Sequence, residues 1–333
     1  ARQAREVHPG SDTVAALAPE EAARVPMLQR GVTLALLRRV VRELQALGRG
    51  DVDCGQFLNG VHTTDSATDW REFDRARDAH SAKACCLHTG TSFVETCMAA
   101  GLTHDPDTGA PYFGAMDTFV SYTWRSDPSG PKHITLPKLV AAVEEALVAD
   151  PRVADPEAAC CFVDVLVCAQ HRGARPGSGT CPNATDVGQF EAVVDACARL
   201  VLFCTPLTRP KALTRVWCLF ELKSAMERGR PVLVALGTSD RAELRRLMEE
   251  DFGRLEALFT TIRSADAEAT VAADRAMIFG WIERDLGADG FRALDQMVAG
   301  GMRAWLAEAA LGLVAEAERE RGDGGGGGDG GGD

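Results

Sequence analysis

The feature that most constrains this chain is a strand–helix–strand unit between residues 200 and 236. The runs 200–204 and 232–236 are continuously apolar, which is typical of parallel strands covered on both faces. Between them, Thr214 can cap the start of a helix and Gly229 can end it. Strands that alternate with helices predict an α/β fold with a parallel sheet.

The helix of this unit carries Trp217 and Glu221 one turn apart, so the two side chains share a face. In open α/β sheets, ligands bind beyond the carboxyl ends of the strands, where the loop after Cys204 and the start of this helix lie. Both residues are therefore candidates for a site. A purely structural role for both residues also stays open, because a helical Glu is usually solvated and a Trp usually belongs to the core.

The same alternation continues along the chain and predicts a doubly wound sheet with strand order 2-1-3-4-5, in which the first and third strands are adjacent and parallel. Asp164, inside the second strand, is expected to be a hydrogen-bonding group at the sheet end. The predicted strands are 118–122, 160–168, 200–204, 231–236 and 258–262, and the predicted helices include 136–148, 241–258 and 267–286.

The flanks of this unit are less regular. We interpret residues 1–110 as an accessory region with an apolar-striped helix at 33–47 and a second helix near 92–100. A C-terminal helix is predicted at 287–321. The Gly- and Asp-rich tail 322–333 has no side chains to bury in a core, so we expect disorder there.

Composition narrows the classes of partner. The formal net charge of −12 and a pI near 5.1 argue against a nucleic-acid partner, which needs clustered Lys and Arg. We expect no membrane partner, because no apolar run approaches the roughly 18–20 residues that span a bilayer. The 11 cysteines include no CxxC pair and no zinc-finger spacing, which favours free thiols, no metal site and a cytoplasmic location. The first residue is Ala rather than Met, which is compatible with a lost leading segment.

Four segments, in order, resemble the Toll/interleukin-receptor (TIR) domain family. The most specific is WCLFEL at 217–222, which is similar to the plant-type signature of Trp-Cys-Leu, a variable residue, Glu and Leu. The resemblance is nearest to divergent TIR-like proteins of algae and protists. The other three segments are FVSY at 119–122 with Trp124 and Arg125 after it, FVD at 162–164, and 190–204.

The resemblance covers about residues 116–286 of an expected domain at 111–286, and it implies a flavodoxin-like five-stranded parallel sheet with helical N- and C-terminal additions. In family members that cleave NAD, the Glu of the signature is catalytic. This implies that Glu221 is the catalytic carboxylate of an NAD nucleosidase, for which NAD is a substrate and not a cofactor. The implied nucleotide-contacting residues are Ser121, Trp124, Arg125 and Trp217.

A carboxylate suits that reaction, because nicotinamide leaves as a neutral base and the remaining ribosyl centre carries positive charge. Two departures bear on nucleotide contacts: Thr123 and Trp124 stand where plant-type domains have Arg-Gly, and residues 172–186 do not align. A structural role for Trp124 and Arg125 therefore stays open. The resemblance also implies self-association, and it leaves two alternatives: a non-enzymatic interaction module and a receptor that binds a nucleotide without cleaving it.

Overall fold

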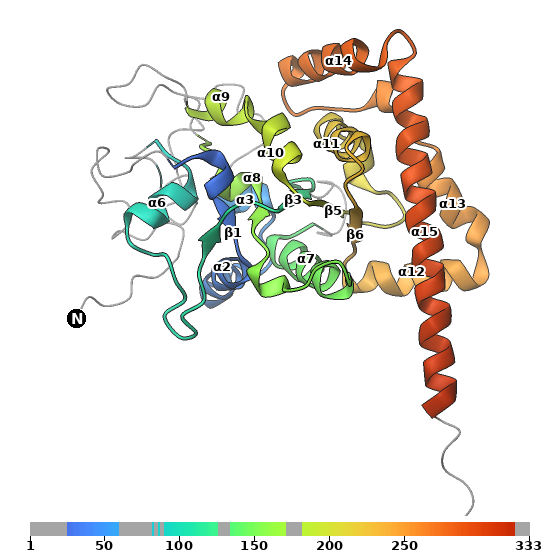
Figure 1. Ribbon diagram of the computed structural model, residues 1–333, viewed down its shortest axis with the longest axis horizontal. Coiled ribbons are helices and arrows are strands. Elements are labelled where there is room, and N and C mark those ends of the chain that lie inside the picture. The colour runs from blue at the N-terminus through green and yellow to red at the C-terminus, as the bar shows by residue number, and fades with distance from the viewer. Residues whose placement is uncertain are drawn as a thin grey trace, which may run out of the picture.

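The computed structural model describes most of the chain and shows an α/β fold built on one mixed six-stranded sheet (Figure 1). The described residues are 25–59, 82, 86, 90–125, 134–170 and 182–323. The strand order is β2-β1-β4-β3-β5-β6. The strands are β1 Gly31–Val32, β2 Phe113–Gly114, β3 Thr118–Ser121, β4 Cys161–Phe162, β5 Arg199–Phe203 and β6 Val232–Ala235.

The parallel part of the sheet follows the predicted order. β3 lies between β4 and β5 and pairs with both in parallel, and β6 pairs in parallel with β5. Thr118 is opposite Arg199 and Ser121 is opposite Leu202. The prediction that the strands near 118 and 200 are central, adjacent and parallel is therefore confirmed, and so is the order of the first four predicted strands.

The prediction of an all-parallel, five-stranded sheet is wrong in two ways. Residues 258–262 form no strand, because they continue helix α13 (Phe252–Thr260) and the turn after it, where Leu255 and Phe259 are buried one turn apart. At the opposite edge, β1 pairs antiparallel with β4 and with β2, so the sheet is mixed. The region expected to be accessory thus supplies one strand, β1, to the sheet, and the edge strand β2 lies at the start of the expected domain.

The second predicted strand is much shorter than expected. β4 ends at Phe162, and Val163 leads into a short helix, α8 (Asp164–Val167), whose residues Val165, Leu166 and Val167 are all buried. A fully buried run is apolar in either conformation, so its hydrophobicity could not separate strand from helix. The correction moves Asp164 from mid-strand to the first position of a helix.

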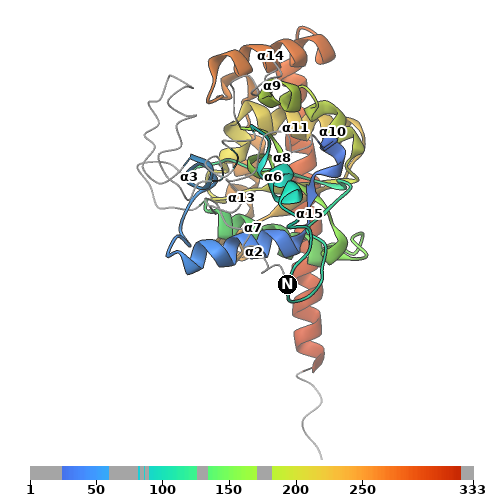
Figure 2. The same cartoon turned by 90° about the vertical axis from the view of Figure 1, so that its left-hand side faces the viewer.

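Helices cover both faces of the sheet (Figures 1 and 2). On one face α7 packs against β5 and β6, with α2 beside it, and on the other face lie α10 and α11. Helix α7 begins after Thr135, whose hydroxyl accepts a hydrogen bond from Lys138 N. The bounds are α2 Leu34–Ala46, α7 Leu136–Ala149, α10 Phe190–Ala196 and α11 Val216–Glu227.

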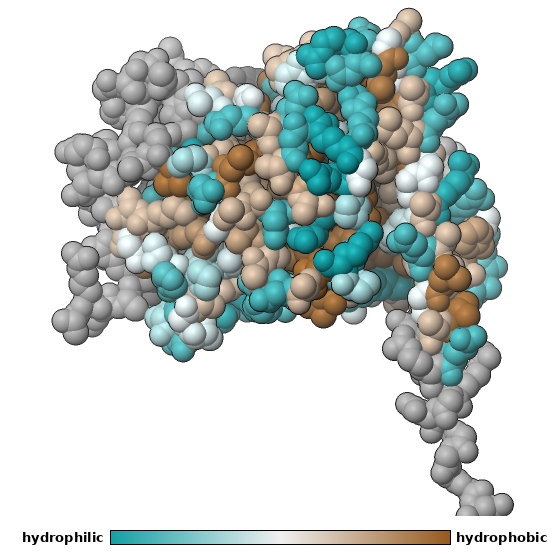
Figure 3. All heavy atoms as spheres, in the orientation of Figure 1, coloured by the Kyte–Doolittle hydropathy of each residue, from teal (hydrophilic) through white to brown (hydrophobic). Residues whose placement is uncertain are grey.

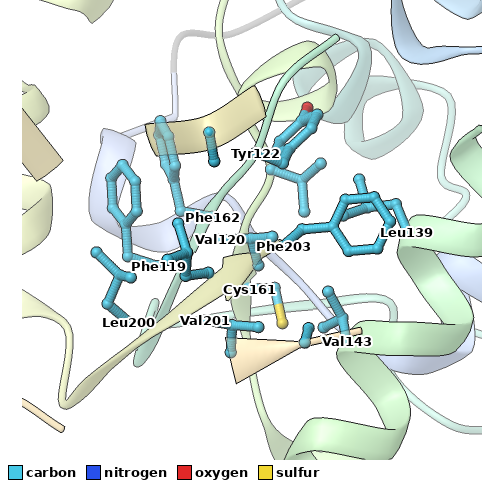
Figure 4. Packing of buried hydrophobic residues seen from close by; sticks show 14 of the residues in the cluster. Phe119, Val120, Tyr122, Leu139, Val143, Cys161, Phe162, Leu200, Val201 and Phe203 are labelled. Atoms are coloured by element: carbon cyan, nitrogen blue, oxygen red, sulfur yellow. The ribbon is translucent and has the colours of Figure 1, made fainter. Parts of the chain in front are cut away.

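The core lies on both sides of β3 and β5 (Figure 4). Phe119 and Phe162 stack with ring centroids 4.7 Å apart on the α10 and α11 side of the sheet. Phe203 lies on the other side, near Leu139 and Val143 of α7. All five side chains are buried, so both faces of the sheet are covered, as the continuously apolar strands predict.

Several predicted helix ends are confirmed, and one is wrong. Gly229, with φ +63°, follows the end of α11, as predicted. Helix α6 (Phe93–Ala99) starts with a capping box formed by Ser92 and Glu95. Thr214, however, does not cap α11. It belongs to a preceding 3-10 turn, η4, where its hydroxyl donates to Lys211 O at 2.9 Å, and the N-cap position is Arg215.

The C-terminal helices pack beside β6 and α11. Helix α15 contacts α11, α13 and α14 through buried Leu294, Val298 and Leu306. Its later turns extend away from the body, and Leu311 is 70 % exposed there (Figures 1 and 3). The bounds are α12 Thr238–Glu250, α14 Ala272–Leu286 and α15 Gly290–Asp323, and the shorter elements are η2 Met27–Gln29, α3 Cys54–Asn59, η3 Pro156–Ala158, α9 Pro182–Val187, η4 Lys211–Thr214 and η5 Ser264–Asp266.

One helix in the described part of the chain is long and apolar enough to cross a membrane by length and composition alone. It is the segment Gly290–Ala315 of α15, contrary to the expectation that no segment reaches that length. Mostly buried core helices of soluble proteins pass the same test, whereas 22 % of the apolar window of this helix is buried. The predicted disordered tail lies outside the described residues, except that Gly322 and Asp323 continue α15.

Candidate functional site

Glu221 lies at the carboxyl end of β3, beside Ser121, the last residue of that strand. The Glu221 residue is only 8 % exposed and Ser121 is buried. Burial raises the pKa of Glu221 to about 8; the neighbouring Ser121 hydroxyl lowers it and the charge of Asp164 raises it further. The Ser121 hydroxyl also lowers the pKa of the Cys218 thiol, although burial dominates and leaves that pKa raised.

These two polar groups have few partners within the described residues. Ser121 Oγ is buried and makes no hydrogen bond of good geometry there, although it is close enough to the carboxyl of Glu221 to affect its pKa. Among the described residues, no Lys, Arg or His forms an ion pair with Glu221. Buried polar groups are normally satisfied, so such a pair marks a candidate ligand site.

A second carboxylate, Asp164, is held at the start of α8 near the same end of the sheet. It accepts hydrogen bonds from Tyr122 Oη, from Trp124 Nε1 at 2.8 Å and from Val165 N at 2.8 Å. Burial raises the pKa of Asp164 and outweighs these hydrogen bonds, which lower it. The expectation that Asp164 is a hydrogen-bonding group at the sheet end is confirmed, but it sits on a helix and not within a strand.

The predicted site residues Trp124 and Arg125 follow β3 and face different partners. Trp124 is fixed by its hydrogen bond to Asp164 and is partly buried against the core. Arg125 reaches α3: a Cβ atom built on Gly55 would lie 2.4 Å from Arg125 Nε. The backbone of Gly55 also donates to Trp124 O at 3.3 Å. The N-terminal part of the chain therefore positions the segment after β3.

Trp217 shares helix α11 with Glu221 and makes its contacts with neighbouring helices. Its ring meets Phe190 of α10 edge-on at 5.3 Å and lies 6.4 Å from Trp281 of α14. Its Nε1 donates to Asp274 at 3.2 Å. These contacts are those of a side chain that anchors the helix to the core, which is the structural role that the sequence left open for Trp217.

Three other observations limit what the site can be. Residues 126–133 and 171–181, which follow β3 and α8 and include His171, Arg172 and Arg175, lie outside the described residues. Among the described residues, no group of three His, Cys, Asp or Glu side chains could hold a metal ion. The cysteines in this part of the chain are free and buried.

Sequence reasoning placed Glu221 at this site from its position on the helix, and only the resemblance implied Ser121; the structure brings the two residues together. Sequence reasoning did not find the hydrogen bonds from Tyr122 and Trp124 to Asp164. The available signal was an acidic residue inside an otherwise apolar run, which requires buried donors nearby. Comparisons of the chain with protein-family models, with curated proteins and with solved structures gave no match.

Proposed function

We propose that this chain is a TIR-like protein that cleaves the nicotinamide–ribosyl bond of NAD, with Glu221 as the catalytic carboxylate. The observation that carries the proposal is a buried glutamate without a cationic partner among the described residues, at the carboxyl end of β3, with a pKa raised to about 8. Such an arrangement lowers stability, and strongly perturbed carboxylates of this kind cluster at functional sites.

The order of the parallel strands supports the family assignment within the proposal. β4-β3-β5-β6 corresponds to the order 2-1-3-4 of a flavodoxin-like sheet, and Glu221 follows the third of these strands in the chain. The site then lies where open α/β sheets bind ligands. If the fold derives from a flavodoxin-like sheet, α13 has replaced the fifth strand in the chain, and β1 and β2 have been added to the sheet.

The chemistry follows from charge. When nicotinamide departs, the ribosyl centre becomes cationic, and a carboxylate in a water-poor site stabilises that charge far more than one in water. A nearby cation favours the ionised form of Glu221, so substrate binding lowers the pKa of this group from about 8. The hydroxyl of Ser121 can donate to the carboxylate or bind a ribose hydroxyl.

The other candidates take supporting roles in this proposal. Trp124 and Asp164 position the segment after β3, and Arg125 joins it to α3. Trp217 anchors α11 to α10 and α14 and thereby fixes where Glu221 points. We further propose that the protein acts in the cytoplasm, in signalling or defence, and that self-association completes the site.

The test is nicotinamide release from NAD by purified protein, measured with and without forced clustering. Glu221→Gln keeps the size of the side chain and removes its charge. We expect it to lower the rate by on the order of 10²-fold or more. The matched control is Glu249→Gln, at an exposed position of α12. If clustered wild-type protein releases no nicotinamide, or if Glu221→Gln matches wild type, the enzyme proposal fails.

The second candidate is a non-enzymatic TIR-type interaction module. It is favoured by the small exposure of Glu221 and by the fact that the indole N–H groups of Trp124 and Trp217 are both used inside the protein. Under this alternative the Glu221→Gln variant self-associates as wild type does, and neither protein consumes NAD.

A further inference from the structure

A pocket of about 460 Å³ lies between the segment after β5 and the C-terminal helices. Arg209 and Thr214 line it from one side, Arg254 of α13 from another, and Arg263 from the turn before η5. Its volume lies within the roughly 300–1,000 Å³ that is usual for small-molecule sites. Glu221 does not line it, so the pocket is separate from the site described above.

The lining of this pocket is positively charged in an acidic protein. Three arginines stand against one carboxylate, Asp266, which gives the lining a formal charge of +2 in a chain of net charge −12. None of the three guanidinium groups has an ion pair or a hydrogen bond among the described residues, although Arg254 is close enough to Glu243 to help lower the pKa of that carboxyl. Arginines elsewhere do form ion pairs, among them Arg38 with Glu144 and Glu157, and Arg246 with Glu243 and Glu250. The charges in the pocket are thus available to a ligand.

The rest of the lining is largely apolar. Leu213, Ile262 and Ala267 are buried beneath the pocket, and Leu258 is half-buried beside them. Guanidinium groups match the oxygens of a phosphate in paired hydrogen bonds, while an apolar floor favours the body of an organic ligand. A simple inorganic anion would use the arginines alone and would leave this floor uncovered.

We propose that this pocket binds a small organic phosphate with at least two negative charges, of the nucleoside diphosphate class. Its phosphates lie against Arg209, Arg254 and Arg263, and its ring or other apolar body lies over Leu213 and Ile262. The carboxylate of Asp266 is placed to accept a hydrogen bond from a hydroxyl of the same ligand. This site is independent of the proposed reaction at Glu221.

The test is isothermal titration of the full chain with ADP, and with adenosine and pyrophosphate as its separate halves. We expect ADP to bind wild type with a Kd below about 1 mM and to bind at least tenfold more weakly to the double variant Arg254→Gln, Arg263→Gln. The control is Arg245→Gln, Arg246→Gln, which removes the same charge from exposed positions of α12.

Because all four replaced arginines are exposed, and exposed ion pairs such as those of Arg246 contribute little to stability, both variants should keep nearly the wild-type melting temperature. Weaker ADP binding in the pocket variant, with unchanged binding in the α12 variant, supports the proposal. Three results would each overturn it: no ADP binding to wild type, equal loss in both variants, or binding of pyrophosphate or adenosine as tight as that of ADP.

Discussion

Replacement of Glu221 by Gln should make the protein more stable at alkaline pH and leave it unchanged near pH 4.5. The reason is the raised pKa of Glu221, from the ordinary 4.5 to about 8. Between these values the folded state holds a proton that the unfolded state releases. The stability of the wild type therefore falls as pH rises from about 4.5 to about 8, and it stays lowered above that range. Gln resembles the protonated acid and has no such loss.

The size of the effect follows from the two pKa values. Each pKa unit is worth about 1.4 kcal/mol, so the full difference corresponds to roughly 5 kcal/mol above pH 8 and roughly 3 kcal/mol at pH 7. These are upper limits, because a buried site relaxes when it becomes charged. At about 2 °C per kcal/mol for a chain of this size, the variant should melt up to roughly 10 °C above wild type at pH 9.

The assay is thermal unfolding of wild type and Glu221→Gln between pH 4.5 and pH 9 at constant ionic strength. Glu249→Gln, on the exposed side of α12, serves as the control and should follow wild type at every pH. If the curves of wild type and Glu221→Gln stay parallel across this range, Glu221 is not buried without a partner, and the argument for the site fails with it.

Three further outcomes are expected. Ser121→Ala removes a hydroxyl that lowers the pKa of Glu221, so the stability loss of this variant on raising pH should be centred at a higher pH than that of wild type, as the same melts would show. Trp217→Ala should cost about 2–4 kcal/mol in denaturant unfolding, because the half-buried ring loses its contacts with Phe190 and Trp281, and a cost near zero would exclude an anchoring role. Nicotinamide release per molecule should increase with protein concentration if self-association completes the site, and a constant specific activity would contradict that.

The parts of the fold that were predicted correctly carry local signals. The run 200–204 is continuously apolar and ends in Thr205-Pro206, so its length and type could be recognised. The predicted fifth strand failed because the apolar residues at 255, 258 and 259 also line one face of a helix, and only packing against α15 decides between strand and helix. β1 and β2 are two residues long and pair with distant segments, so they leave no periodic pattern.

The candidate site likewise has a part that the sequence could predict and a part that it could not. Glu221 could be placed from sequence because it follows from its helix and from the position of sites in parallel sheets, whereas Ser121 was implied only by the resemblance. The ties from Tyr122 and Trp124 to Asp164, about 40 residues away in the chain, depend on the early end of β4. The pocket lined by arginines likewise brings Arg209 close to Arg254 and Arg263, although α11 and β6 lie between them in the chain. No spacing in the sequence predicts that these residues line one pocket.

The antiparallel strand β1 has a consequence for how this chain can be divided. By pairing with β4 through Val32 and Cys161, it shields an edge of the sheet that would otherwise present unpaired backbone donors and acceptors. A fragment that starts at residue 111, where the sequence suggests a domain boundary, would lose β1 and bare that edge. Such a fragment would be prone to strand addition between copies, so its aggregation would reflect a cut through the sheet and not instability of the sequence that follows.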